Sequence, residues 1–512
     1  MRILSIFLGM QYVEKAPGIG AKSDDTPEKA SGSQRKVVVG QKEKNCEQAL
    51  KVLEFTCTKK TNKEAAHVSI LTQIVQESIV KLLSLDISEG LGVFLEKGQK
   101  AAFELLCKLA SCRMSEMDNC IFEHPEARTD WVVVQKERKR TICTEVGEIQ
   151  YRRRYYLNRK TGQRASLLDA MTGVEKYSKI ETNYALKIIE NSTKMSYEKA
   201  GNISGAVPIS KTTVMNKTRE VEDFRLPAGE KNTSVEEIHI QADEDHVHMR
   251  DGKADIAKLA VIHTTKEKEN KTRNRLVDKR ICTSYKENND EFWYQIQDAI
   301  HEKYGVRDNL KVYIHGDGAN WIKAGLNIIP NTVPILDTFH LMKQLRRICH
   351  GKYNIVICDY IRKNDFKKLK ILLDTLVANG DADAKEAGEV YSYVFNNREG
   401  AVNALTLDTG GSCAEGLVSH LVSERFSRIA CGWGEKGLDT VLRLRTFFLN
   451  GGKLNPENMI HHDEVLAEFD SLKREYIASK TYEPEHSFNI TALTPDVHKL
   501  TWLKKLARDF AI

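Results

Sequence analysis

Three acidic residues, far apart in the chain, each lie where an apolar stretch gives way to small or polar residues. Asp243 follows the apolar positions of residues 235–242, and Asp317 follows residues 310–314 within the sequence His-Gly-Asp-Gly. Glu415 lies in a segment of small residues, 410–416, that opens an amphipathic stretch. Two divalent metal ions about 3.5 to 4 Å apart can hold the attacking and leaving oxygens of a phosphodiester in line, and they need shared carboxylate ligands. Asp243, Asp317 and Glu415 are therefore candidates for a metal site that acts on phosphodiesters.

Two other acids compete for the same roles. Asp245 lies two residues beyond Asp243, so both face the same side if the strand continues, and either then suits a metal. Asp243 ranks first because it directly ends the apolar strand, and residues 246–248 are expected to resume a strand. Glu424 follows Glu415 by nine residues, roughly two and a half helical turns, and we expect it on a similar face further along the axis. A Glu in a first helical turn is also what the helix dipole alone favours.

A third apolar stretch, residues 333–336, stops at Asp337, and His340 follows at the start of an expected helix. Asp337 suits the N-cap of that helix, and His340 suits a packed position on it. Residues 341–397 continue with helical spacing, and one apolar face carries Phe366, Leu369, Leu372, Leu373 and Leu376. The acids therefore belong to a strand-rich region that a helical segment interrupts.

A basic cluster precedes this region. Residues 131–134, 141–144 and 149–156 are rich in β-branched and aromatic residues, and residues 145–147 suit a turn, so we expect a small β-ribbon. The ribbon carries Arg152, Arg153 and Arg154 among tyrosines, a pattern that suits contact with phosphates and stacking on bases. The alternatives are a solvated basic face, and tyrosines that form the core face of the ribbon.

A helix-turn-helix pattern follows the ribbon. Residues 196–202 and 210–219 have helical spacing around a turn at 205–208, and Ser210 suits the N-cap of the second helix. Polar side chains of such a second helix can read base edges; they are Lys211, Thr212, Thr213, Asn216 and Lys217. An ordinary helical hairpin has the same pattern and is the alternative.

Bulk properties set the remaining limits. The chain has 512 residues, 41% of them hydrophobic, and a net charge of +6, which indicates a multidomain protein with a mild basic excess. Its 11 cysteines form no Cys-x-x-Cys pair, so we expect neither a disulfide framework nor a zinc module, and a reducing cytoplasm fits best. No stretch approaches about 18 unbroken apolar residues, so no membrane span is expected.

Several motifs, taken in order, resemble a known family. HIQADEDHVHM, VYIHGDGANWIKAG, ILDTFHLMKQL and GSCAEGLVSHLVSERFSR are similar to segments of the insertion-sequence transposases of the ISLre type, a Mutator-like branch of the DDE recombinases. The ribbon segment GEIQYRRRYY and the segment GGKLNP also resemble that family. The similarity runs from about Val68 to the C-terminus, and the first 50 or so residues lie outside it.

The resemblance implies a ribonuclease H-like fold with the first acid on its first strand, the second at the end of its fourth, and a Glu on a late helix. These positions correspond to Asp243, Asp317 and Glu415. The same branch carries Cys or Asp and then His, separated by two residues, after the second acid, which implies a supporting role for Asp337 and His340. It also implies an all-α insertion before the Glu, which would hold the transposon end.

The implied activity is transposition. Water would hydrolyse a strand at the end of the element, and the freed 3′ hydroxyl would attack target DNA, with two Mg²⁺ or Mn²⁺ ions as cofactors. The implied partners are double-stranded DNA, as transposon ends and as target, and a second copy of the chain in a synaptic complex at the nucleoid. Two alternatives stay open: an inactive DNA-binding derivative of the same fold, and a ribonuclease H-like nuclease that cuts without joining.

The expected fold class is multidomain α+β. A ribonuclease H-like α/β core would be interrupted by an all-α insertion and preceded by α-helical and small β-ribbon DNA-binding regions. The expected boundaries are a flexible leader at 1–50, a helical region at 51–125, the basic ribbon at 126–170, a helix-turn-helix-like region at 171–228, the core at 233–345 and 406–450, the insertion at 346–405, and a helical tail at 451–512.

Overall fold

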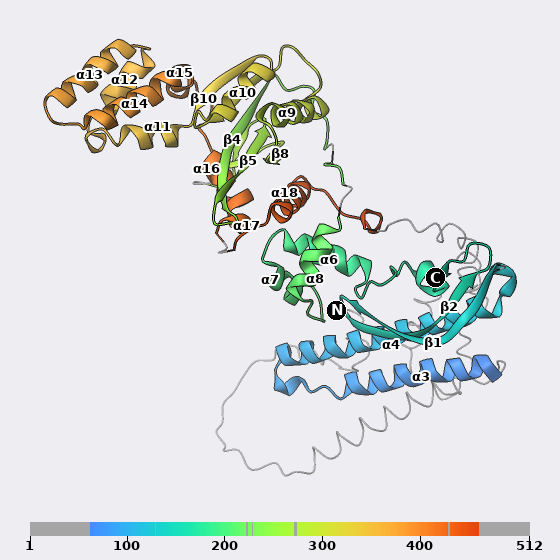
Figure 1. The fold of residues 1–512 in the computed structure, drawn as a ribbon. Helices are drawn as coiled ribbons and strands as arrows, with labels where there is room; N and C mark the ends of the chain where they lie inside the picture. The colour runs from blue at the N-terminus through green and yellow to red at the C-terminus, as the bar shows by residue number, and fades with distance from the viewer. Residues whose placement is uncertain are drawn as a thin grey trace, which may run out of the picture. The chain divides into compact units, whose positions relative to one another are not determined.

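The computed structural model describes residues 62–128, 130–221, 224–227, 229–270, 274–428 and 431–459 (Figure 1). The described residues form a mixed α+β structure with three separate sheets. The chain divides into two compact units, residues 1–101 and 102–512. The leader predicted over residues 1–50, and the part of the predicted tail beyond residue 459, lie outside the described residues.

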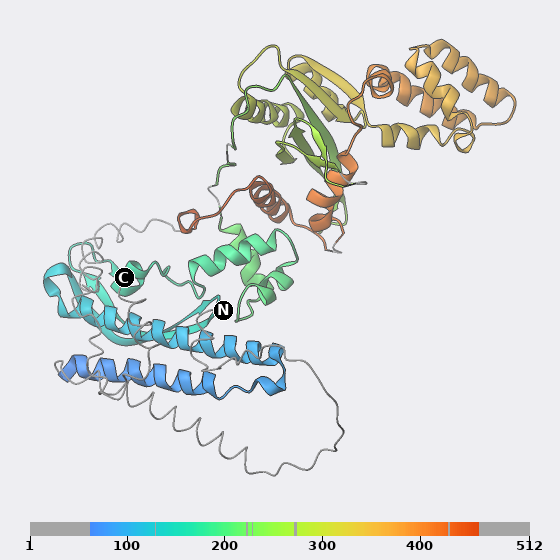
Figure 2. The same cartoon turned by 180° about the vertical axis from the view of Figure 1, so that it is seen from behind.

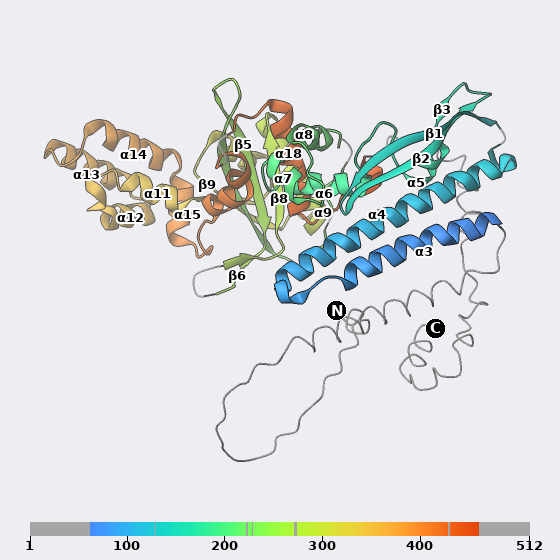
Figure 3. The ribbon, with the colours of Figure 1, turned by 90° about the horizontal axis from the view of Figure 1, so that it is seen from below.

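The first unit contains a helical hairpin. Helix α3 (Asn62–Leu83) is followed by a 3₁₀ turn, η1 (Ile87–Glu89), and by the beginning of α4 (Leu91–Glu123), which continues into the second unit (Figure 3). The Asp86 side chain accepts a hydrogen bond from Ser88 N and so caps the 3₁₀ turn. Gly90, at φ +108°, then allows the chain to reverse into α4. The predicted helical region is confirmed from residue 62 onward, and its residues 51–61 lie outside the described residues.

The second unit begins with a β-ribbon packed on the rest of α4. Strand β1 (Trp131–Thr144) pairs antiparallel with β2 (Gly147–Asn158), which also pairs with the short β3 (Arg164–Ala165). Helix α5 (Leu167–Thr172) completes a small core with α4 and the ribbon. The predicted β-ribbon is confirmed, and its first strand also includes the charged residues between the β-rich stretches 131–134 and 141–144. The charged residues between them still hydrogen-bond to β2, with only two irregularities of register before Arg138.

Three short helices follow: α6 (Thr182–Ser192), α7 (Tyr197–Ile203) and α8 (Lys211–Arg219). The Ser196 hydroxyl caps α7 by accepting from Lys199 N, and the Ser210 hydroxyl caps α8 by accepting from Thr213 N. The helix, turn and helix predicted from the sequence, with Ser210 as N-cap, are confirmed. A core that includes Ile188, Ala200 and Val214 holds the three helices together.

A five-stranded sheet lies at the centre of the second unit, in the order β10-β9-β4-β5-β8. Its strands are β4 (Glu237–His248), β5 (Ala254–His263), β8 (Arg280–Tyr285), β9 (Lys311–Gly316) and β10 (Thr332–Leu336). Strand β4 is parallel to β9, and β9 is parallel to β10, whereas β5 is antiparallel to both of its neighbours. A separate hairpin of β6 (Lys266–Lys268) and β7 (Asn274–Leu276) follows β5.

The two faces of this sheet carry different side chains. Ile238, Ile240 and Ala242 of β4 pack under α9 (Asn289–Tyr304) and α10 (Asn320–Ile328). Successive side chains of a strand alternate between faces, so His239, Gln241 and Asp243 face the other side. All three are buried there. The sheet therefore buries a row of polar groups on the face opposite its apolar core.

The prediction that this strand ends at Asp243 was wrong. Strand β4 continues to His248, because β5 pairs with it without interruption from His239 through His248. Pairing with β9 extends only to Gln241. Asp243 therefore projects from the middle of β4, two residues beyond the point where β9 diverges, and not from a strand end.

A helical insertion follows β10 and lies next to it at one edge of the sheet (Figure 2). It contains α11 (Thr338–Leu345), η3 (Cys349–Gly351), α12 (Asn354–Arg362), α13 (Phe366–Ala378), α14 (Ala384–Asn396) and α15 (Arg398–Thr406). The apolar face predicted on α13 is confirmed, since Phe366, Leu369, Leu373 and Leu376 are buried in the core of the insertion.

The chain then returns to the polar face of the sheet. Helix α16 (Ala414–Val418), a π-helical turn η4 (Ser419–Ser423), α17 (Glu424–Phe426) and α18 (Glu435–Leu449) cover Leu259 and Val261 of β5, and η5 (Pro456–Asn458) follows. Among the described residues, no helix is both long and apolar enough to cross a membrane.

Three buried histidines line up across the polar face. His239 Nδ1 lies 3.0 Å from His315 Nε2, and the ring of His239 stacks on that of His263 with 5.2 Å between centroids. Burial lowers the pKa of all three imidazoles, that of His263 to about 3. The cluster is therefore neutral at pH 7.

These histidines predict a loss of stability in acid. Unfolding returns each imidazole to a pKa of about 6.5, so below that pH the unfolded chain binds more protons, and each buried histidine costs about 1.4 kcal/mol per pH unit. The stabilisation is complete above pH 6.5 and declines as the pH falls. In His263→Gln, denaturant titrations between pH 6 and pH 4 should give a shallower decline in unfolding free energy. Equal slopes in the variant and the native protein would contradict this account.

Candidate active site

Asp243 lies among charges that come from three distant parts of the sequence. Burial raises its pKa to about 6, and the negative charges of Asp317 and Glu415 raise it as well, whereas a hydrogen bond from Glu244 N and the charge of His340 oppose the rise. The fold has thus brought three of the predicted acids, with His340, into one electrostatic neighbourhood. Each arrives on a different element: β4, the turn after β9, α16 and α11.

The turn that carries Asp317 is held from several directions. Asp317 Oδ1 accepts a hydrogen bond from Ala319 N at 2.9 Å, and Tyr393 of α14 donates its hydroxyl to the Asp317 carbonyl oxygen at 2.9 Å. Gly318 has φ +92°, and a Cβ there would lie 2.4 Å from Asn397 Oδ1. Both the positive φ and the close approach of Asn397 therefore require glycine at position 318. Tyr393 and Asn397 of the insertion thus pack against the turn that carries Asp317.

The two alternative acids have other partners. Asp245 Oδ2 accepts a hydrogen bond from Ser427 Oγ at 2.5 Å, and Glu424, 58% exposed, lies 3.5 Å from Arg445 Nη2. The expectation that Glu424 shares a face with Glu415 was wrong. A spacing of about two and a half turns leads to the opposite side of a regular helix, and here the π-helical turn η4 also intervenes. Asp243 and Glu415 remain the stronger candidates.

Asp337 and His340 form a pair beside the acids. Asp337 caps α11 by accepting from Phe339 N at 2.7 Å, and His340 Nδ1 lies 3.6 Å from Asp337 Oδ2. Burial opposes ionisation of Asp337, but the nearby His340 and hydrogen bonds from Ser412 and Phe339 N hold its pKa below the usual value. The neighbouring Asp337 carboxylate raises the pKa of His340. The predicted N-cap is confirmed, and the charges of Asp243 and Asp317 also raise the pKa of His340.

The three carboxylates fit divalent metal ions in donor chemistry, because Mg²⁺ and Mn²⁺ prefer hard oxygen ligands. In the described part of the chain, no three His, Cys, Asp or Glu side chains converge closely enough to hold a metal ion as they stand. Burial is the main cause of the raised pKa of Asp243, the charges of Asp317 and Glu415 add to it, and a bound cation would lower that pKa. Metal binding would thus require the three side chains to draw together by rotation.

The basic ribbon presents fewer charges than its sequence suggested. Arg152 is 60% exposed and pairs with Glu137, whereas Arg153 is buried against Asp169 of α5. Arg154 pairs with Asp118 of α4 at 2.6 Å and lies over the Phe122 ring. Of the three arginines expected to contact phosphates, only Arg152 is turned to solvent in this structure.

The burial of Arg153 and Arg154 could not be predicted from the ribbon sequence alone, because their acidic partners, Asp169 and Asp118, lie on α5 and α4. The exposed cations on β1 and β2 are Lys136, Arg138 and Lys139, together with Arg152. The tyrosines divide in the same way: Tyr151 and Tyr156 belong to the ribbon's core, and Tyr155 lies under the Arg138 guanidinium at 4.9 Å.

Helix α8 presents part of its predicted polar face. Lys211, Thr212 and Asn216 are exposed, and the half-buried Thr213 shares a hydrogen bond with Ser210 Oγ. The Lys217 side chain is only 13% exposed and lies between Glu175 and Glu220, at 3.5 Å and 2.7 Å. Three of the five predicted side chains are therefore accessible to a large ligand.

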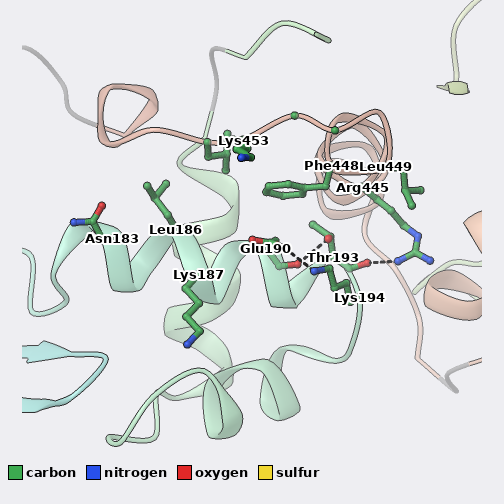
Figure 4. A pocket seen from close by; sticks show the side chains of 13 residues that line it. Asn183, Leu186, Lys187, Glu190, Thr193, Lys194, Arg445, Phe448, Leu449 and Lys453 are labelled. Atoms are coloured by element: carbon green, nitrogen blue, oxygen red, sulfur yellow. Dashed lines mark hydrogen bonds and ion pairs between the residues drawn. The ribbon is translucent and has the colours of Figure 1, made fainter. Parts of the chain in front are cut away.

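A cavity of about 550 Å³ between α6 and the end of α18 is distinct from this site (Figure 4). Three of the four cations that line it have protein partners: Arg445 Nη1 donates to the Thr193 carbonyl at 2.7 Å, Lys194 pairs with Glu190 at 2.6 Å, and Lys187 pairs with Glu145. None of the predicted acids lines it, so the cavity does not belong to the proposed chemistry.

Three residues near the acids were not found from the sequence. Gln241 lies two residues before Asp243 on the same face of β4, Ser412 precedes Glu415 by three residues, and Tyr393 contacts the Asp317 turn. The period-two alternation of β4 was a signal for Gln241. Nothing local marks Tyr393, because its partner lies 76 residues away.

One known protein family matches most of this chain. The matching family is the uncharacterised protein family UPF0236, over residues 89–463. A UPF0236 protein of Caldanaerobacter subterraneus subsp. tengcongensis, whose name joins TTE0033, TTE0744 and a series of further locus designations, is 32% identical over 406 residues, 77% of this chain and 86% of that relative. Another UPF0236 protein of that organism is 30% identical over 481 residues, 89% of this chain and 96% of the relative.

The different surroundings of neighbouring arginines predict different effects on stability. Arg153→Ala leaves the buried Asp169 with Arg140 and Tyr151 but without its closest cation, and should lower the free energy of unfolding by about 3 kcal/mol. Arg152→Ala removes only an exposed pair and should change it by less than about 1 kcal/mol. Urea titration of both variants makes the comparison. Equal losses would show that Arg153 is not buried as described.

Proposed function

This chain belongs to the UPF0236 family, and we propose that it is a DNA transposase that cleaves and joins strands by metal-dependent phosphodiester chemistry. The observation that carries the proposal is the electrostatic neighbourhood of Asp243, Asp317 and Glu415, assembled from a central strand, a strand end and a later helix. Almost any protein has acids after strands. Far fewer gather three of them, from sites up to 172 residues apart by their numbering, beside one buried polar face.

The topology of the sheet supports the proposal. A ribonuclease H-like core has its first strand in the centre, an antiparallel hairpin partner and third strand on one side, and two parallel strands on the other. The order β8-β5-β4-β9-β10, with β5 antiparallel and β9 and β10 parallel to β4, agrees with that arrangement. Asp243 then lies on the first core strand, Asp317 directly after the fourth, and Glu415 on a helix after the insertion.

In this proposal, Asp243, Asp317 and Glu415 hold two Mg²⁺ or Mn²⁺ ions. Bound there, the ions would activate water and stabilise charge on the leaving oxygen. The protein's own part is orientation: the capped turn fixes Asp317, and Asp337 holds His340 close to the acids. When it is protonated, His340 would offset part of the repulsion among the three carboxylates.

The reaction has two phosphoryl transfers. Water attacks phosphorus at the element's end, the bond to the 3′ oxygen breaks, and that oxygen leaves as a 3′ hydroxyl after taking up a proton. The 3′ hydroxyl then attacks a target phosphodiester, loses its proton, and displaces the target's own 3′ oxygen. The number of phosphodiester bonds is conserved in this joining step, so it needs no external energy source.

Only the exposed side chains among those predicted to bind DNA, together with other exposed cations of the ribbon, would contact it. Lys136, Arg138, Lys139 and Arg152 on the ribbon suit phosphates, and Lys211, Thr212 and Asn216 on α8 suit base edges or backbone. Pairing of two transposon ends implies at least two copies of the chain. This activity would place the protein on nucleoid DNA.

The relatives add independent support. One relative's name joins many locus designations of a single organism. A gene that recurs at many loci is expected of an element that moves and copies itself. Neither a DNA-binding regulator nor a housekeeping nuclease requires such recurrence.

Asp317→Asn tests the proposal directly. We expect the variant to lose strand cleavage by at least about a hundredfold, because one shared carboxylate ligand is removed, while binding to the element's ends persists. The substrate is a labelled duplex with the DNA that flanks the gene, incubated with Mg²⁺ or Mn²⁺ and target plasmid.

The matched control is Asp298→Asn on the exposed side of α9, which should cleave and join normally. Cleavage that survives Asp317→Asn would overturn the site. Native protein that cuts without joining would be a nuclease, and native protein that binds the ends without cutting would be an inactive derivative.

A further inference from the structure

The turn before Glu415 is held by side chains from three separate elements. Gln241 Oε1 of β4 lies 3.2 Å from Cys413 N and 3.3 Å from Ser412 Oγ. Asp337 Oδ2, at the start of α11, accepts from Ser412 Oγ at 2.9 Å. Lys266 of β6 donates to the carbonyl oxygens of Gly410 and Gly411. Residues 410–413, here called the latch turn, are thus fastened immediately before Glu415.

The small residues of the latch turn are explained by these contacts. Gly410 and Gly411 have φ +66° and +73°, two consecutive left-handed conformations that residues with a Cβ rarely adopt. This path turns both carbonyl oxygens towards the Lys266 ammonium. Ser412 then supplies the hydroxyl for Asp337, and the Cys413 amide faces Gln241. The Gly-Gly-Ser-Cys segment is therefore shaped by what it binds.

The orientation of the Gln241 amide follows from its neighbours. Cys413 N–H is only a donor, so the amide oxygen must face it, and the Gln241 nitrogen must face His263 Nε2, which lies 3.1 Å away. His263 Nε2 must then accept, which puts the imidazole proton on Nδ1. Burial keeps His263 neutral, with a pKa of about 3, so it remains an acceptor throughout the ordinary pH range. The amide has one favourable orientation.

We propose that Gln241 is a positioning residue that fixes the latch turn and thereby sets the place of Glu415 beside Asp243. Only the expected effect of Gln241 on cleavage rests on the transposase function proposed above; its contacts with the latch turn do not. Gln241 is 1% exposed and lies on the same face of β4 as Asp243, so one strand carries both an acid of the site and the anchor for another. Loss of the Gln241 anchor leaves the latch turn with its contacts to Lys266 and Asp337, and so loosens the start of the helical segment that carries Glu415.

The test compares Gln241→Met with Gln297→Met in the full chain. Methionine keeps the length of the side chain but neither donates nor accepts strongly. Gln297 on α9, whose amide reaches only the Ile328 carbonyl at 3.5 Å, provides the same substitution on the other face of the sheet. Hydrogen–deuterium exchange of metal-free protein reports the latch turn through peptides that cover residues 408–418. Strand cleavage and binding to the element's ends are measured in parallel.

We expect Gln241→Met to accelerate exchange in that segment and to lower cleavage about 10- to 100-fold with end binding unchanged, the size usual for groups that orient metal ligands. Gln297→Met should change none of these. Lys266→Met, which removes another anchor, should give the same exchange result if Gln241→Met folds poorly. Unchanged exchange, or faster exchange with full cleavage, would overturn the proposal. Native protein without cleavage activity would contradict the proposed function, while the exchange result would still decide whether Gln241 holds the turn.

Discussion

The alternation of side chains along β4 is the constraint on which the rest of this structure depends. Ile238, Ile240 and Ala242 on one face of the strand pack under α9 and α10, so the other face must accept the residues that lie between them. Those residues are His239, Gln241 and Asp243, all buried. Burying polar groups is costly unless each finds a partner, and much of the surrounding architecture supplies such partners. Neutral histidines stack beside His239, and the turn before α16 provides donors for Gln241. Burial raises the pKa of Asp243 to about 6, and the hydrogen bond from the Glu244 amide offsets only part of that rise.

The helical insertion and the active site are connected by the same logic. Tyr393 lies on α14, yet its hydroxyl holds the backbone of Asp317, and Asn397 fills the space that the absence of a Cβ at Gly318 leaves open. Asp337 both begins the insertion, as the cap of α11, and accepts from Ser412 at its far side. The chain therefore leaves and re-enters the sheet region at points that touch predicted site residues.

Local sequence patterns predicted those parts of the fold that local physics controls. The 3.6-residue period of α13 placed Leu369 and Leu373 in a core, and Ser210 was recognised as a cap. Predictions failed where a distant segment decides the outcome. The continuation of β4 beyond Asp243 depends on β5, which pairs with polar residues as readily as with apolar ones because ladder hydrogen bonds use the backbone. Arg153 is buried because it pairs with Asp169 on another element. Gln241 has its hydrogen-bond partner in a turn more than 170 residues later in the sequence. The resemblance to transposases supplied the grouping of acids, which no single strand pattern contains.

The central claim is that Asp243, Asp317 and Glu415 together bind divalent metal, and binding of Mn²⁺ measured by electron paramagnetic resonance tests it most directly. Glu415→Gln and Glu424→Gln are matched substitutions on the same helical segment, and only the first removes an acid that interacts with Asp243. The account predicts that Glu415→Gln weakens Mn²⁺ binding strongly while Glu424→Gln leaves it unchanged. Equal binding by the native protein and Glu415→Gln, or loss of binding only in Glu424→Gln, would contradict it.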